Sequence, residues 1–170
     1  MDAQERRQSI ARRLELAEGP VSAAVLAREC SGSRQVIGGD IALLRAAGLD
    51  VAATPRGYIL PREPVGLVRT LATCHSGEAM EHELNAIVDQ GCTVVDVIVD
   101  HPIYGQLTGP LHLSNRYEVG QFLQRCREES AAPLSQLTEG IHLHTVICPD
   151  AAAFSRVCAA LRELDVLLED

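Results

Sequence analysis

The chain has 170 residues, enough for one or two domains whose cores fold without a metal or disulfides. Its six cysteines form no C-x-x-C pair, which argues against a disulfide-rich secreted protein, and no apolar run approaches the roughly 20 residues that cross a bilayer, which argues against a membrane protein. We therefore expect reduced thiols and a cytoplasmic location. The net charge of −8 is uneven, because residues 1–62 hold nine arginines against seven acidic residues whereas residues 63–170 hold six against sixteen.

Residues 1–62 read as three short helices followed by a hairpin. Apolar residues recur at helical spacing in the first helix, which a Glu-Gly-Pro sequence ends. The third helix has Ser33 in the position of an N-cap and Gly48 at its end. The hairpin sequence alternates around a Pro-Arg-Gly tip. The second helix, the third helix and the hairpin are expected within residues 20–30, 33–48 and 49–60.

This order of elements, with a tight turn between the second and third helices, is typical of a winged helix-turn-helix. In that fold the first residues of the third helix enter the major groove, which would place Ser33, Arg34 and Gln35 against bases or phosphates. Arg56 at the hairpin tip could reach a neighbouring minor groove or phosphate. The basic charge of this half is small, so a helical domain that does not bind DNA remains an alternative.

The proline-containing stretch at residues 60–66 separates two predicted domains, 1–62 and 63–170. The second reads as an α+β domain with helices packed on a mixed or antiparallel sheet. Ser76 is expected to begin its first helix, and Asp150 to cap its last one. The expected strands lie within residues 65–74, 92–101, 106–113 and 140–148, and the expected helices within 76–91, 114–130 and 150–165.

His142 and His144 lie two positions apart in an apolar stretch that reads as a strand. Since a strand repeats every two residues, both imidazoles should project from the same face. His75 follows the first strand of this domain, and Glu83 comes eight residues later, about two helical turns along. Together they make a plausible ligand set for a divalent ion such as Zn, Ni, Fe or Mn, with a position left open. The equally weighted alternative is that these histidines bind no ion and merely form hydrogen bonds within the fold or lie at its surface.

Five stretches carry a family resemblance: "SRQVIGGDIALLRAAG" and "ATPRGYIL" in the first half, and "CHSGEAMEHELNAIVDQG", "DVIVDHPIYGQL" and "PLSQLTEGIHLHTV" in the second. With these motifs the chain resembles the niacin-responsive transcriptional repressors over about residues 5–165. Members of that family join a winged helix-turn-helix to a three-histidine (3H) domain and control genes of NAD biosynthesis or niacin uptake.

The resemblance implies that His75, Glu83, His142 and His144 bind a divalent metal and that nicotinic acid acts as co-repressor. It also implies a homodimer that reads a palindromic operator. The expected mechanism is allosteric repression, in which nicotinate favours the dimer geometry that matches DNA. A metal-sensing repressor and a small metal-dependent enzyme are the alternatives.

Nicotinate carries a carboxylate and a pyridine nitrogen, and either could fill the open position on the metal. Tyr104, Arg116 and Thr138 are the candidate partners for the rest of this ligand. One feature departs from the family pattern, because Gly38 and Gly39 stand in the middle of the recognition helix where bulkier or charged residues are expected. Each glycine costs about 1 kcal/mol relative to alanine, so this helix is expected to be loose until it meets DNA.

Overall fold

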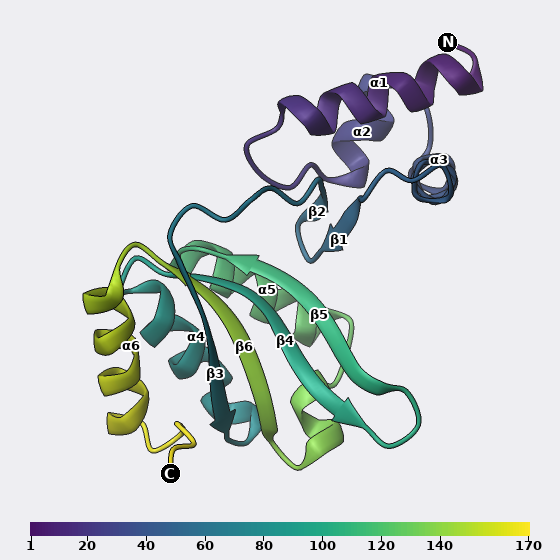
Figure 1. Ribbon diagram of the computed structural model, residues 1–170. Coiled ribbons are helices and arrows are strands. Elements are labelled where there is room, and N and C mark those ends of the chain that lie inside the picture. Colours follow the sequence, from purple (N-terminus) through teal and green to yellow (C-terminus); the bar gives the residue numbers. More distant parts are fainter. The chain divides into compact units, whose positions relative to one another are not determined.

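The computed structural model describes residues 1–170, and the chain divides into two compact units, Met1–Glu63 and Pro64–Asp170. This division lies one residue from the predicted boundary between residues 62 and 63. Figure 1 shows the helices and strands of both units. No helix is long and apolar enough to cross a bilayer.

Three helices and a two-stranded antiparallel wing make up the first unit. Ser33 caps α3 as predicted, because its side chain accepts a hydrogen bond from the N–H of Val36 at 3.2 Å. Gly48 follows the helix with a φ of +96°, a conformation that favours glycine. Only four residues separate α2 from α3, so the predicted winged helix-turn-helix is confirmed. The elements are α1 (Ala3–Leu16), α2 (Ala23–Glu29), α3 (Arg34–Ala46), β1 (Ala52–Thr54) and β2 (Gly57–Ile59).

Aliphatic side chains from all three helices form the core of this unit. Ile10 and Leu14 of α1 pack with Leu26 of α2 and with Ile37 and Ile41 of α3, and none is more than 1% exposed. Burial of each such side chain stabilises the fold by about 1.5–3 kcal/mol. The packing therefore fixes which face of α3 points inward and which is left for a partner.

A buried ion pair joins α3 to α1 beside this core. Asp40 is 3% exposed and accepts a hydrogen bond from Nε of Arg6 at 2.5 Å. Nη1 of Arg7 lies 3.5 Å from the other carboxylate oxygen. A buried carboxylate needs such partners, so the charge of Asp40 ties the two helices together.

A four-stranded antiparallel sheet with the order β3-β6-β4-β5 forms the second unit. Figure 1 shows α4, α5 and α6 on one face of this sheet, and their apolar side chains share one core with the strands. The predicted α+β fold is confirmed, and all strand pairs are antiparallel. The elements are β3 (Leu67–Cys74), η1 (Gly77–Ala79), α4 (Met80–Val88), β4 (Thr93–His101), β5 (Gly105–Leu113), α5 (Arg116–Glu128), η2 (Leu134–Thr138), β6 (Ile141–Cys148) and α6 (Ala151–Glu163).

The start of α4 differs from the prediction. Ser76 makes no capping hydrogen bond, and Gly77–Ala79 form a 3₁₀ turn, so the α-helix begins at Met80 rather than at Ser76. Glycine disfavours an α-helical first turn, and 3₁₀ turns are frequent at helix N-termini. The predicted cap of α6 is correct, because the Asp150 side chain accepts from the N–H of Ala153 at 2.7 Å.

The C-terminal segment adds backbone pairing that the sequence did not predict. The N–H of Cys74 donates to the carbonyl of Val166, and the N–H of Leu168 donates to that of Ala72, both at 2.9 Å. Strand β3 is therefore held on one edge by β6 and on the other by residues 166–168. This double pairing fixes the strand that leads to His75.

Candidate functional site

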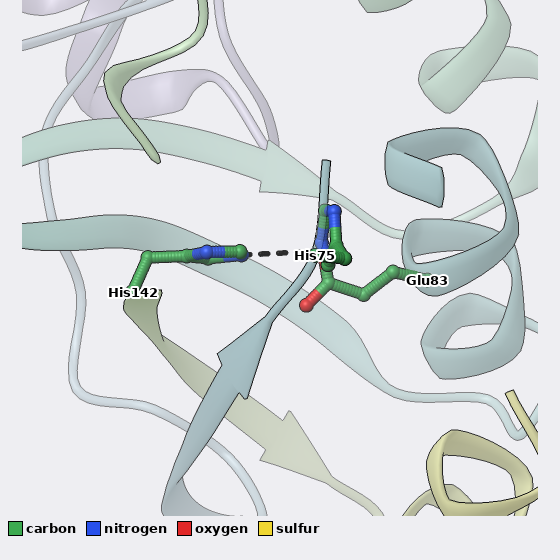
Figure 2. A group of neighbouring side chains, drawn as sticks. All are labelled: His75, Glu83 and His142. Carbon is green, nitrogen blue, oxygen red and sulfur yellow. Dashed lines mark hydrogen bonds and ion pairs between the residues drawn. The ribbon is translucent and has the colours of Figure 1, made fainter. Parts of the chain in front are cut away.

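The pairing of β3 with β6 sets the positions of the two strand histidines. In this register Thr73 lies opposite His142. Burial alternates along β6, so His142 and His144 both project from the helix-covered face, as the period of two predicts. The face that they share is the interior of the second unit. Figure 2 shows His142 pointing toward His75 and Glu83.

Glu83 is the point on which the histidines converge. It lies in the first turn of α4 and is 1% exposed. Nε2 of His75 is 2.5 Å from Oε2 of Glu83. The Nε2 atoms of His142 and His144 are each 3.3 Å from the same oxygen. Three imidazoles therefore face one buried carboxylate oxygen.

The other ring nitrogen of each imidazole is held by a backbone carbonyl. These contacts involve the Nδ1 atoms of His75, His142 and His144 and the carbonyl oxygens of Ser76, Gly140 and Asp96, at 2.6, 2.8 and 2.7 Å respectively. A carbonyl oxygen only accepts, so each Nδ1 carries a proton and donates. A neutral ring then has its lone pair on Nε2. All three lone pairs consequently point toward Glu83.

This arrangement gathers three Nε2 atoms and a carboxylate, all acceptors when the rings are neutral, around one side-chain hydroxyl, that of Thr73, which lies 3.0 Å from Nε2 of His142. Burial alone would raise the pKa of Glu83, but its contacts with the three imidazoles hold that pKa well below the usual value. Burial likewise lowers the pKa of His75 and of His144, yet the close contact with the charged Glu83 outweighs it and raises both pKa values above 6.5. The carboxylate is therefore ionised and attracts positive charge, either as protons on the rings or as a cation.

Two buried atoms of the cluster have no hydrogen-bond partner: Oε1 of Glu83 and Nε2 of His144. Unsatisfied buried polar atoms are rare in native proteins, and a bound ion is one of their explanations. Ligand atoms of His75, Glu83 and His142 lie within 4.8 Å of one another, so this group could hold a metal ion. Imidazole and carboxylate ligands suit Zn, Ni, Fe or Mn, and the carbonyls on Nδ1 orient the rings as outer partners of a metal site usually do.

Gly140 connects two of the histidines through its backbone. Its carbonyl accepts from Nδ1 of His142 and, at 3.3 Å, from the N–H of His75. Its own N–H donates to the carbonyl of Ser135 at 2.8 Å. The residue has a φ of +92°, and a Cβ at this position would overlap the carbonyl oxygen of His75. Only glycine fits here without displacing the segment that carries His75.

The three candidate effector residues lie in different parts of the second unit. Tyr104 is 73% exposed at the tip of the β4–β5 hairpin, with its ring 5.0 Å from that of His101. Arg116 begins α5 and donates to both carboxylate oxygens of Asp89, at 2.7 and 2.5 Å. Thr138 ends η2, and its hydroxyl lies within hydrogen-bond distance of the carbonyls of Ser135 and Ile141, either of which can accept its one proton. No contact joins these three side chains to one another, and their role in effector binding stays a prediction.

The candidate DNA contacts lie at the start of α3 and in the wing. Ser33 uses its hydroxyl as the helix cap, while Arg34 and Gln35 are exposed on the first turn. Arg56 lies in the turn between β1 and β2. Gly38 lies in the same continuous helix, about one turn after Arg34. Their contacts with DNA stay predictions.

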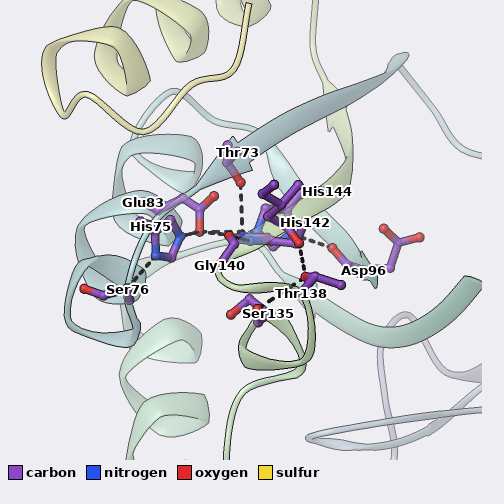
Figure 3. A network of polar contacts seen from close by, with 11 residues as sticks. Thr73, His75, Ser76, Glu83, Asp96, Ser135, Thr138, Gly140, His142 and His144 are labelled. Atoms are coloured by element: carbon purple, nitrogen blue, oxygen red, sulfur yellow. Dashed lines mark hydrogen bonds and ion pairs between the residues drawn. The ribbon is translucent and has the colours of Figure 1, made fainter. Parts of the chain in front are cut away.

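Sequence reasoning missed two residues that touch the histidine cluster. Oγ1 of Thr73 lies 3.0 Å from Nε2 of His142, and Figure 3 marks this contact with a dashed line. The carbonyl of Gly140 accepts from the ring of His142 and from the backbone N–H of His75. A glycine directly before the H-x-H strand was a usable signal for a special backbone position. Nothing local marked Thr73, because its contact depends on the register of β3 against β6.

Comparison with known proteins gives two family matches. Residues 6–59 match an HTH domain, and residues 68–170 match the 3H domain. The chain is 42% identical over 167 residues to the probable transcription repressor NiaR of Thermotoga maritima, covering 98% of this chain and 95% of that protein. It is 39% identical over 161 residues to the transcription repressor NadR of Bacillus subtilis, covering 92% and 89%. Both relatives bear the names of transcription repressors, the first as a probable one.

Proposed function

The chain belongs to the niacin-responsive repressor family of NiaR and NadR, and from this we propose that it represses genes of NAD biosynthesis or niacin uptake with nicotinic acid as co-repressor. The observation that carries the proposal is the convergence of three imidazoles on the buried carboxylate of Glu83, within a 3H domain that follows an HTH domain. The first unit would bind operator DNA, and the second would sense the effector.

Four residues would hold a divalent transition metal: His75, Glu83, His142 and His144. The converging Nε2 lone pairs and the unpartnered buried atoms support this set, including His144, whose Nε2 lies 3.3 Å from Glu83. A metal bound there supplies a Lewis-acidic position that a carboxylate or a pyridine nitrogen can fill. The protein's own part is to fix the ligands, since each Nδ1 is held by a backbone carbonyl.

Thr138 is the effector contact that we would test first. Its hydroxyl donates to the carbonyl of Ile141, the residue before His142. Tyr104 and Arg116 are proposed as further contacts, and both have exposed side chains whose present partners could be exchanged. Arg116 offers the bidentate geometry that suits a carboxylate.

In the first unit, Ser33, Arg34 and Gln35 would enter the major groove and Arg56 would touch the neighbouring backbone or minor groove. We further propose a homodimer that reads a palindromic operator, because two-fold assemblies match two half-sites. Nicotinate would raise DNA affinity only by its differential affinity for the DNA-competent state, typically about 1–3 kcal/mol per coupled site.

Calorimetric titration of the metal-loaded protein with nicotinic acid tests the effector half of this proposal. We expect micromolar binding that is lost in a His144→Ala variant and is much weaker for nicotinamide, which lacks the carboxylate. Absence of heat with a verified metal content would contradict a nicotinate sensor. DNA affinity that follows the metal and ignores nicotinate would then favour a metal-sensing repressor with the same ligands.

A further inference from the structure

Thr73 is a fully buried polar residue that faces the candidate metal ligands. Its relative exposure is 0%, and its Oγ1 lies 3.0 Å from Nε2 of His142, the residue directly opposite in the sheet register. Figure 3 shows the two side chains in contact on the inner side of β3 and β6. The neighbouring backbone of Cys74 pairs with Val166, so the strand is held on both edges. The hydroxyl is therefore fixed in place.

The direction of this hydrogen bond follows from the tautomer of His142. Nδ1 of that ring donates to the carbonyl of Gly140 at 2.8 Å, so Nε2 is the acceptor of a neutral ring. The hydroxyl of Thr73 must then be the donor. It occupies the same lone pair that His142 would offer to a metal.

Metal binding therefore deprives Thr73 of its acceptor inside a fully buried site. A buried donor without a partner is costly, so the hydroxyl needs a new acceptor close to Nε2 of His142. Oε1 of Glu83 has no hydrogen-bond partner, and no hydrogen bond joins it to the hydroxyl of Thr73, which contacts the imidazole instead. The other group that a metal would bring close to Nε2 of His142 is the ligand that completes the metal's coordination.

We propose that Thr73 is a specificity-determining residue of the effector site, whose hydroxyl donates to an anionic atom held at the open position of the metal. For the co-repressor this atom would be a carboxylate oxygen of nicotinate, and that identification rests on the proposed function. A hydrogen bond to an ionised oxygen is stronger than one to a neutral imidazole. Thr73 thus favours a charged carboxylate over an uncharged amide in the same position.

A Thr73→Val variant tests this role because valine keeps the shape and removes the hydroxyl. The protein is loaded with Co²⁺, whose visible spectrum reports both metal occupancy and changes in coordination, and is titrated with nicotinate and separately with azide. We expect Co²⁺ affinity within about twofold of wild type, and nicotinate and azide affinities lower by about tenfold. Thr73→Ser, which retains the hydroxyl, should recover much of the anion affinity.

Thr70→Val is the matched control. Thr70 lies on the same strand, three positions before Thr73 and so on the opposite face, where it is exposed and opposite Thr145. This variant should bind Co²⁺ and both anions as the wild type does. Thermal unfolding of the two valine variants shows whether either change harms the fold itself.

Three results would overturn the inference. Unchanged anion affinity in metal-loaded Thr73→Val would mean that the hydroxyl does not contact the bound anion. Loss of Co²⁺ binding in that variant would assign Thr73 to the metal site instead. Wild-type protein that binds neither anion would show that the metal has no open position. Wild type that binds azide but not nicotinate would contradict the proposed effector, while the azide series still decides the role of Thr73.

Discussion

Alanine in place of Gly38 or Gly39 should stabilise the first unit. Both glycines lie inside α3, in helical conformation, and a Cβ built at either position meets no atom within 4 Å. Alanine is better than glycine in a helix interior by about 1 kcal/mol. In a unit of this size such a gain raises the unfolding midpoint by about 4–8 °C. The double variant should gain about twice the single effect, because neither methyl group finds a clash.

Differential scanning calorimetry of the full chain measures these midpoints. Gly120→Ala is the matched control, since Gly120 lies within α5 with equally open surroundings and belongs to the second unit. Gly57→Ala should act in the opposite direction, because Gly57 has a φ of +137° and a Cβ there would overlap the carbonyl of Val21. A lower midpoint for Gly38→Ala or Gly39→Ala would refute the reasoning, because it would mean that the added methyl group clashes with an atom although the structure leaves its position open.

The metal-free protein should lose stability as pH rises above 6.5 and through the raised pKa values of His75 and His144, because the protonated rings stabilise the ionised Glu83. The stability that Glu83 contributes through its own lowered pKa is lost only in acid. Denaturant titrations across this pH range measure both trends, and a metal-free protein that becomes more stable above pH 6.5 would contradict them. Metal affinity should fall as pH drops through the raised pKa values of His75 and His144, by about tenfold per pH unit for each proton displaced. Calorimetry in two buffers of different ionisation enthalpy counts those protons. An Asp40→Asn variant should lower the unfolding midpoint of the first unit, because Arg6 loses its buried carboxylate partner. An unchanged midpoint would mean that this ion pair does not hold α3 against α1.

The sequence predicted the fold well where the signal is local. Ser33 and Asp150 are caps that the chain marks within a few residues, and both make the expected hydrogen bond. The H-x-H spacing correctly placed His142 and His144 on one face of a strand. The predicted start of α4 at Ser76 was wrong, because Gly77–Ala79 form a 3₁₀ turn and the α-helix begins only at Met80.

The histidine cluster depends on pairings that no local pattern contains. Glu83 meets the strand histidines only because α4 packs on the inner face of the sheet, and Thr73 meets His142 only in the observed register. The carbonyl of Gly140, which accepts from the ring of His142 and from the backbone N–H of His75, is placed by a positive-φ backbone conformation and not by a side chain. Residue types could therefore suggest a ligand set, while the tautomers and the role of Thr73 required the structure.

The most direct test of a metal-dependent, niacin-responsive repressor is selection of DNA fragments from the source genome by the metal-loaded full chain, with and without nicotinate. The account predicts that a small set of fragments with palindromic sites is enriched only when both metal and nicotinate are present, and that His142→Ala abolishes this enrichment. Equal enrichment without nicotinate, or retention of the response in the variant, would contradict the claim that the buried histidine cluster couples niacin to DNA binding.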